Sequence, residues 1–292
     1  MDSTVIVTRF LFGALALVMF GLGLSLSLAD FRRLFKHPKA VTIALVLQVI
    51  GLPLACYAII VGFGLSPVFA VGLMLLAASP GGISANLFSH LFGGNVAMNI
   101  SLTAVNTLLS IVTLPLITNW AIGHFAQGGQ VVPLQTRKLV EVIAIVLVPV
   151  ALGMFVASRR PGFAARMEKP TKVFSGVVLA VVTVLAIANE WKTITSTFAQ
   201  IGIPVLLFNL LSLLAGYYLS RAAGLDKPLA TAISYEIGIH NSTLAIFIAV
   251  SVLGSFPLAL PAAIYSVVMY ITAPFFGWLL LRRPAPSTAP AR

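Results

Sequence analysis

The stretch Ser234-Tyr-Glu-Ile-Gly-Ile-His-Asn241 decides the interpretation of this chain, because it places one carboxylate in the middle of a long apolar segment. An ionisable group at that depth is energetically costly unless it faces a partner, an ion or a water-filled cavity. Gly238 and the polar residues around Glu236 indicate that the helix is interrupted there. Interrupted helices at mid-membrane present backbone groups to ions and substrates in secondary transporters. The stretch therefore points to transport.

The composition is that of an integral membrane protein. Of the 292 residues, 59% are hydrophobic and 9% are charged, and the mean hydropathy is +1.05. The net charge of +11 lies in short loops between apolar segments, so we expect the lipid bilayer and no nucleic acid as a partner. The single cysteine, Cys56, excludes an internal disulfide framework. We predict an all-α, polytopic membrane protein.

Nine segments are long enough to cross a bilayer, which takes about 20 apolar residues each. They are residues 4–28, 40–63, 67–93, 95–122, 136–157, 170–189, 200–221, 228–254 and 260–282. With the N-terminus outside, fourteen of the 18 basic residues fall on the inner side, as the positive-inside rule requires. We expect one transmembrane domain, 1–283, in the cell (inner) membrane, with its N-terminus outside. The Pro- and Ala-rich residues 284–292 are expected to be a disordered cytoplasmic tail.

A second interrupted segment lies in the first half of the chain. Ser79-Pro-Gly-Gly82 breaks an otherwise apolar run, because Pro80 lacks an N–H and the glycines relax the backbone. A shift of 155 residues aligns Ser79 with Ser234 and brings both interruptions into register. We therefore predict an inverted repeat, with the first repeat lacking one helix, and two discontinuous helices that cross at the midplane.

Polar residues in two other spans are further candidates. In the fourth span they recur on one helical face, at Asn99, Thr103, Asn106, Ser110 and Thr113. Asn99 and Thr103 are favoured for function, because the Gly93-Gly94 turn brings that end of the span back toward Asn86. For Asn106, Ser110 and Thr113, interhelical hydrogen bonding is an equal alternative. Gln48, alone in the second span, is equally a helix–helix contact or a ligand.

His240, one helical turn after Glu236, raises two further hypotheses. A transition-metal pair lacks a third ligand, because no other His or Cys shares the interruption. An enzyme is not expected, since no nucleophile–base arrangement accompanies Glu236, and an intramembrane hydrolase is only a remote option. A proton-coupled role for His240 is more credible, because imidazole changes charge near physiological pH.

Three motifs carry a resemblance to a known family. They are Ala78-Ser-Pro-Gly-Gly82 followed by Asn86, Gly94-Asn-Val-Ala97 followed by Thr103, and Glu236-x-Gly238-x-x-Asn241. Together they resemble the bile acid:sodium symporter family in its bacterial form, over about residues 3–283. The resemblance implies a panel domain, from part of 4–63 and from 136–189, packed on a core domain from 40–122 and 200–282. The core would hold the two crossed, discontinuous helices.

The resemblance also implies two sodium sites that flank the crossing and share Glu236. By position, the first site would use Ala85, Asn86, Asn99, Thr103 and Glu236. The second site would use Gln48, Glu236, the carbonyls of Ile237 and Ile239, and His240. No cofactor is implied beyond the coupling sodium ions.

Three positions depart from the family pattern. Ala85 and Asn99 stand where Ser is frequent, so Ala85 offers only its carbonyl while Asn99 keeps an amide oxygen. His240 stands where Gln is frequent. Sodium is a hard cation that prefers oxygen ligands, so an imidazole weakens the second site. A proton in place of one sodium ion is therefore the main alternative.

The expected substrate is a small organic anion. The amino-terminal ends of the second half-helices, near Ser84 and Asn241, carry partial positive charges that favour a carboxylate or a sulfate. The residues expected to hold it are Ile83, Ser84, Asn86, Asn241 and Ser242. The resemblance allows bile acids, pantoate, keto acids and sulfated steroids. We expect sodium-coupled symport by alternating access, with a channel or a non-transporting receptor of the same fold as the competing class.

Overall fold

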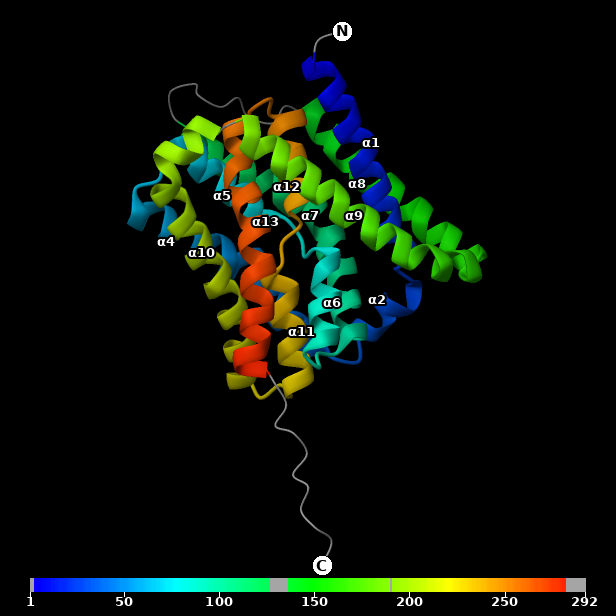
Figure 1. Ribbon diagram of the computed structural model, residues 1–292. Coiled ribbons are helices and arrows are strands. Elements are labelled where there is room, and N and C mark those ends of the chain that lie inside the picture. The colour runs from blue at the N-terminus through cyan, green and yellow to red at the C-terminus, as the bar shows by residue number, and fades with distance from the viewer. Residues whose placement is uncertain (1–2, 127–135, 190, 282–292) are drawn as a thin grey trace, which may run out of the picture.

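A computed structural model describes residues 3–126, 136–189 and 191–281, and every regular element within them is a helix (Figure 1). Four continuous helices in these ranges are long and apolar enough to cross a membrane: Pro38–Phe63, Val96–Phe125, Gln200–Ala222 and Phe256–Leu279. A bent pair, Phe12–Leu24 with Leu28–Leu34, is a fifth candidate span. The predicted all-α, polytopic membrane protein is confirmed at this level. The count of nine spans and the inverted repeat stay predictions.

The first predicted span is shorter than expected and ends in a bend. Helix α1 covers Ser3–Leu24, and α2 (Leu28–Leu34) continues at 68° to it. A capping box begins α2, because Asp30 accepts hydrogen bonds from the Ser27 backbone N–H at 2.8 Å and from its hydroxyl at 2.7 Å. A hydropathy pattern cannot detect this bend, because Leu26 and Leu28 keep the segment apolar.

The second span is continuous but contains an irregular turn. Helix α3 (Pro38–Val46) passes through a π-helical turn, Leu47–Gly51, into α4 (Leu52–Phe63), which ends at Gly64 with φ +61°. Such widened turns are rare and recur at functional sites. This one carries Gln48, which is buried.

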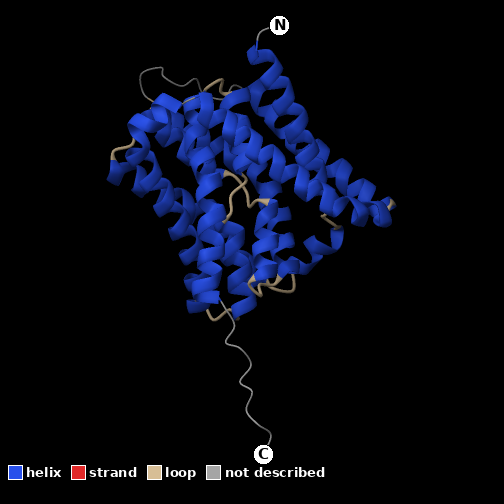
Figure 2. Ribbon diagram, viewed as in Figure 1, coloured by secondary structure: helices blue, strands red, loops and turns tan. Residues whose placement is uncertain are grey.

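Both predicted interruptions are present. Helices α5 (Pro67–Ala78) and α6 (Ile83–Leu91) are separated by the Ser79–Gly82 segment. Helices α11 (Lys227–Gly238) and α12 (Ser242–Phe247) are separated by Ile239–Asn241, and a π-helical turn, Ile248–Val252, extends α12. In Figure 2 the two loop segments cross near the centre of the molecule.

The remaining helices extend beyond the apolar spans predicted for them. They are α7 (Val96–Phe125), α8 (Thr136–Arg159), α9 (Pro161–Asn189), α10 (Trp191–Ala222) and α13 (Phe256–Phe276), which a π-helical turn extends to Leu281. Helices α9 and α10 begin well before the predicted starts at 170 and 200. Hydropathy detects only the apolar part of a helix, whereas backbone hydrogen bonds continue through its polar ends.

Helix α1 packs against α8 and α9 through small residues (Figure 1). A Cβ atom at Gly23 would overlap the Val150 backbone, and one at Gly153 would overlap the Phe20 carbonyl. Small residues allow membrane helices to approach this closely. The division into panel and core domains stays a prediction, and the expected tail, 284–292, lies outside the described residues.

Candidate functional site

The two interruptions are joined by backbone hydrogen bonds. The Gly82 N–H donates to the Ile239 carbonyl at 2.7 Å, and the Asn241 N–H donates to the Pro80 carbonyl at 2.9 Å. Gly81 and His240 thus form an antiparallel bridge. Backbone N–H and C=O groups without hydrogen bonds are costly inside a membrane. Here each interruption supplies hydrogen-bond partners for some of the free backbone groups of the other. The crossing is therefore a fixed structural unit rather than two loose loops.

Glu236, near the end of α11, lies next to this crossing and is fully buried. Thr103 Oγ1 donates to its Oε2 at 2.6 Å, and Asn106 Nδ2 donates to its Oε1 at 2.9 Å. Gly81 faces the carboxylate so closely that a Cβ atom there would overlap it. Among the described residues the only ion pair joins Arg33 to Asp30, so no basic side chain pairs with Glu236.

Several buried amide oxygens lie on the helices around Glu236. Asn99 Nδ2 donates to the Ala232 carbonyl at 2.7 Å, which fixes the side chain and leaves Asn99 Oδ1 without a partner among the described residues. The Oδ1 atoms of Asn86 and Asn106 also lack partners there. Asn86 is on α6, which packs against α7 and α11, and Ala85 beside it is fully buried. Carboxylate, hydroxyl and amide oxygens are the ligands that fit a hard cation.

A second polar group surrounds the Ser79 carbonyl, at the end of α5. Gln48 Nε2 donates to this carbonyl at 3.1 Å, and His240 Nδ1 lies 3.1 Å from it. A carbonyl can only accept, so this contact requires a proton on Nδ1, and in the neutral ring the lone pair is then on Nε2. Gln48 Oε1 and His240 Nε2 are both buried without a partner among the described residues. The His240 ring stacks on Phe208, with 5.5 Å between ring centroids.

The carbonyls at the end of α11 are used unequally. The Gly238 carbonyl accepts from Asn209 Nδ2 at 3.0 Å and from the Tyr265 hydroxyl at 2.9 Å, which fills both of its lone pairs. The Ile239 carbonyl accepts the bond from Gly82 and keeps one lone pair. Ile237 is fully buried beside Glu236.

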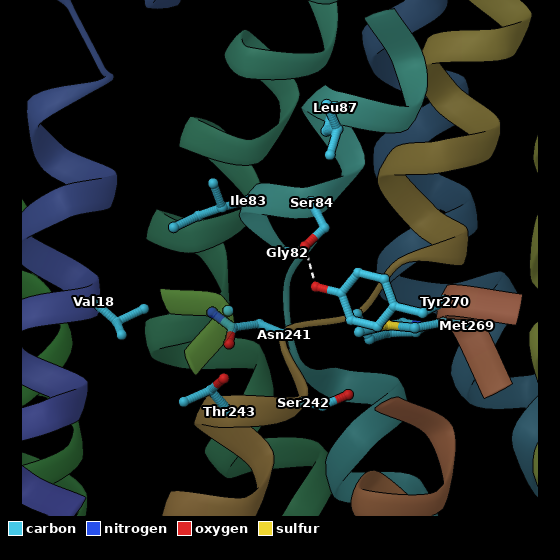
Figure 3. A pocket seen from close by; sticks show the side chains of 12 residues that line it. Val18, Gly82, Ile83, Ser84, Leu87, Asn241, Ser242, Thr243, Met269 and Tyr270 are labelled. Carbon is cyan, nitrogen blue, oxygen red and sulfur yellow. Dashed lines mark hydrogen bonds between the residues drawn. The ribbon is translucent and has the colours of Figure 1, made fainter. Parts of the chain in front are cut away.

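A pocket of about 170 Å³ lies beside the crossing, and Gly82 and His240 from the two interruptions are among the residues that line it. Its lining includes Ile83 and Ser84 at the start of α6, and Asn241 and Ser242 at the start of α12. Figure 3 shows Ser84 hydrogen-bonded to Tyr270 of α13, at 2.5 Å between the hydroxyls, and Asn241 pointing toward α1. Helices α1 and α9 close the pocket with Val18 and Gly176. Asn86 lies further along α6 and does not line it.

Three residues of the site were missed or undecided from the sequence. For Asn106 the sequence favours helix packing and function equally, because periodicity indicates the face of a helix but not which helix lies against it. In the sequence, Ser79 is only part of the interruption, and its carbonyl lacks an intrahelical donor because α5 ends at Ala78. Tyr270 carries no signal in the sequence, because α13 is largely apolar and its few polar residues do not single out Tyr270.

Comparison with known proteins identifies a family and several relatives. Residues 13–197 match the model of the sodium bile acid symporter family. The uncharacterized sodium-dependent transporter YocS of Bacillus subtilis (strain 168) is 31% identical over 257 residues, which are 87% of this chain and 77% of that protein. The ileal sodium/bile acid cotransporter of Oryctolagus cuniculus is 25% identical over 230 residues, covering 79% of this chain and 66% of that protein.

Plant proteins show a similar likeness. The probable chloroplastic sodium/metabolite cotransporter BASS2 of Oryza sativa subsp. japonica is 28% identical over 256 residues, covering 87% of this chain but 60% of that protein. The chain thus spans about three fifths of the length of this relative. These three relatives are named as transporters or cotransporters, not as enzymes. From the family match over residues 13–197 and the likeness to the Bacillus protein, the chain belongs to the sodium bile acid symporter family.

Proposed function

We propose that this protein is a sodium-coupled symporter of a small organic anion that works by alternating access. The observation that carries the proposal is Glu236, a fully buried carboxylate held by two neutral donors behind a crossing of two interrupted helices. A buried charge without an opposite charge is strongly unfavourable. A cation that binds with the substrate supplies that charge only during part of the transport cycle.

The first sodium ion is assigned to the oxygens on α6, α7 and α11. Glu236 and Thr103 contribute a carboxylate and a hydroxyl, and Asn99 and Asn86 contribute amide oxygens that otherwise have no partner. The Ala85 carbonyl completes the expected set. Asn106 joins this group as a residue that orients the carboxylate, because its amide N–H groups hold Glu236 Oε1.

The second ion is assigned to the α3–α4 side of the crossing. Gln48 Oε1 and the carbonyls of Ile237 and Ile239 are its expected ligands, together with Glu236. His240 Nε2 favours a second candidate function, proton-coupled transport by the same fold, since it is a buried imidazole nitrogen with no partner among the described residues. The two differ in which cation gradient drives uptake. No cofactor besides the coupling ions is needed.

The pocket beside the crossing is the proposed anion site. The amino-terminal ends of α6 and α12 both line it, and helix amino termini favour negative charge. Asn241 and Ser242 would hold the anion from α12, and Ile83 and Ser84 from α6. Its volume of about 170 Å³ is smaller than the roughly 300 Å³ lower bound of drug-sized ligand pockets. This favours a short carboxylate over a steroid.

The position of the pocket between two groups of helices supports alternating access. One wall belongs to α1 and α9, and the other to α6, α12 and α13. Movement of the first group against the second would open the pocket to one side of the membrane and then to the other. We place the protein in the cell membrane, with the N-terminus outside and the C-terminus in the cytoplasm.

Uptake into proteoliposomes tests in one experiment which ion gradient drives transport and which anion is carried. A panel of labelled carboxylates and sulfates is offered with an inward sodium gradient, with potassium instead, and with a pH gradient alone. Glu236→Gln keeps the size of the side chain but removes its charge. It should lower sodium-driven uptake about a hundredfold or more, because unpairing a buried charge costs roughly 3–5 kcal/mol.

A fold-based control separates loss of function from loss of structure. Sodium chloride, compared with potassium chloride at equal ionic strength, should raise the unfolding temperature of the wild type but not that of Glu236→Gln. Sodium-driven uptake at the wild-type rate in Glu236→Gln or Glu236→Ala would sink the proposal. Uptake driven by the pH gradient and indifferent to sodium would replace it with the proton-coupled carrier.

A further inference from the structure

A basic pocket lies apart from the crossing, between α2 and the start of α7. It has a volume of about 510 Å³, and its lining includes Arg32, Arg33, Lys36 and His37 from one side and Asn95 from the other. Asn95 is the N-cap of α7, a helix of 30 residues, so the partial positive charge of that helix end faces the same space. Cationic side chains and a helix amino terminus together form an environment for an anionic group.

The basic residues of this pocket differ in how they are held. Arg33 Nη1 donates to Asp30 Oδ1 at 2.6 Å and lies 3.3 Å from the Ala97 carbonyl, so it ties α2 to α7. Arg33–Asp30 is the only ion pair in the part of the chain that the structure describes. Arg32 and Lys36 line the pocket with no acidic partner there. Their charges are therefore available to a ligand.

Apolar side chains beside the pocket indicate the kind of ligand. Leu28 is 71% exposed and Phe35 is 85% exposed, at the two ends of the same short helix. Helix α2 also turns away from α1 by 68°, so it does not continue the direction of the span. A helix that presents exposed apolar and basic residues together is typical of a segment lying in a membrane interface.

We propose that this pocket binds the headgroup of an anionic phospholipid. The phosphate is held by Arg32, Lys36 and the start of α7, while Leu28 and Phe35 contact the acyl chains. A freely dissolved phosphate would use the same cations but would leave these two apolar side chains in water. Basic clusters next to a transmembrane helix on its cytoplasmic side are suited to anionic lipid, and the positive-inside rule assigns this segment to that side.

Lipid retention after extraction tests the proposal. The protein is reconstituted into phosphatidylcholine vesicles doped with phosphatidylglycerol and extracted in mild detergent, and the two retained lipids are counted by native mass spectrometry. The double variant Arg32→Gln/Lys36→Gln should lose about 30-fold in its preference for phosphatidylglycerol, from roughly 1 kcal/mol per basic residue near an anionic surface. Arg33 is kept because it holds α2 in place.

The matched control is Arg159→Gln/Arg160→Gln, which removes two exposed basic residues at the turn between α8 and α9. This control should retain the preference, and the charge-keeping variant Arg32→Lys/Lys36→Arg should retain most of it. An equal loss in both Gln variants, or no loss in either, overturns the proposal. Inorganic phosphate, added to the detergent-solubilised protein, should not raise its unfolding temperature as phosphatidylglycerol does. Equal stabilisation by both would assign the pocket to a soluble anion instead.

Discussion

At the scale of single residues, the environment of Glu236 is made of neutral donors. Thr103 and Asn106 hold the two carboxylate oxygens in place, yet neither contributes a positive charge. Asn99 is held by a backbone carbonyl on α11 and keeps its own oxygen without a partner in the described part of the chain. These polar groups are thus already oriented without a cation, which would lower the ordering cost of cation binding at the proposed site.

Thr103→Val should raise the sodium concentration for half-maximal uptake by about tenfold to a hundredfold. The change keeps the shape of the side chain but removes a hydrogen bond to a charged group, which contributes roughly 1.5–3 kcal/mol. Thr107→Val is the matched control, since Thr107 is buried on the same helix but its hydroxyl bonds only the Thr103 carbonyl, at 2.7 Å. Sodium titration of uptake measures both. Equal shifts in the two variants would remove Thr103 from the ion site.

Gly81→Ala should abolish transport and destabilise the protein, because its methyl group would overlap the Glu236 carboxylate. The constraint is close approach, since Gly81 is not among the glycines with positive φ. The new methyl group of Gly123→Ala on α7 has no atom within 4 Å apart from its chain neighbours and its own helix backbone, so this change should stabilise the helix by up to about 1 kcal/mol. Thermal unfolding and uptake are measured on both. Near-wild-type transport by Gly81→Ala would contradict this packing.

The sequence predicted these residues unevenly. Glu236 could be singled out because no other carboxylate lies so deep in an apolar run. The Ser79 carbonyl and the partner of Asn106 could not, since both depend on which helices meet in space. A backbone acceptor also has no residue type of its own, so the Ser79 carbonyl is marked only by its place at the end of a broken helix.

At the scale of elements, side chains of α10 and α13 hold the end of α11 next to the crossing. Asn209 and Tyr265 both donate to the Gly238 carbonyl, and Thr272 in turn donates to Asn209 Oδ1. A helix end in an apolar interior must have its free carbonyls satisfied by other groups. Here the donors come from continuous helices, so the end of α11 is fixed to a rigid support.

Tyr265→Phe and Asn209→Ala should each cost about 1 kcal/mol of unfolding free energy while the other donor remains. The double variant should cost more than the sum, because the Gly238 carbonyl would then be buried without a partner. Tyr57→Phe is the control, since that hydroxyl lies at an exposed site 3.4 Å from His124. Chemical unfolding in detergent gives the four values of the cycle. Strict additivity would show that the two bonds are not a shared anchor.

Helix interruptions were predictable from Pro and Gly, and helix limits were less so. The breaks at Ser79–Gly82 and Ile239–Asn241 lie where the sequence placed them. The bend between α1 and α2 was not predicted, because it depends on the hydrogen bonds between Ser27 and Asp30 in an apolar context.

At the scale of the whole molecule, two groups of helices enclose one pocket. Helices α1, α8 and α9 pack together, and α1 and α9 face the crossing across the pocket. A carrier needs such a site between two parts that can move. A channel needs a continuous polar path instead, and the sequence showed a polar stripe only in the fourth span.

Counterflow should therefore separate these two classes. Vesicles loaded with unlabelled substrate should accumulate labelled substrate transiently above the outside concentration, because exchange on a carrier couples the two fluxes. The measurement is the time course of labelled anion, with vesicles that lack the protein as control. Simple equilibration without overshoot would indicate a channel of the same fold.

The packing of the helices against one another is harder to predict from the sequence than the helices themselves. Composition and the positive-inside rule gave an all-helical membrane protein, and the paired interruptions of α5–α6 and α11–α12 predicted a crossing. The close contact of α1 with α8 at Gly23 and Gly153 was not anticipated, because Gly in a membrane span marks either a kink or a helix contact.

The two hydrogen bonds that join the interruptions have a consequence for how such a protein can change. Both run between main-chain atoms, Gly82 N to Ile239 O and Asn241 N to Pro80 O. Most substitutions of the surrounding side chains leave these atoms in place. Side chains at proposed ligand positions, such as Ala85, Asn99 and His240, can therefore be exchanged while the crossing keeps its shape. The same scaffold can be adapted to a different ion or anion without being refolded.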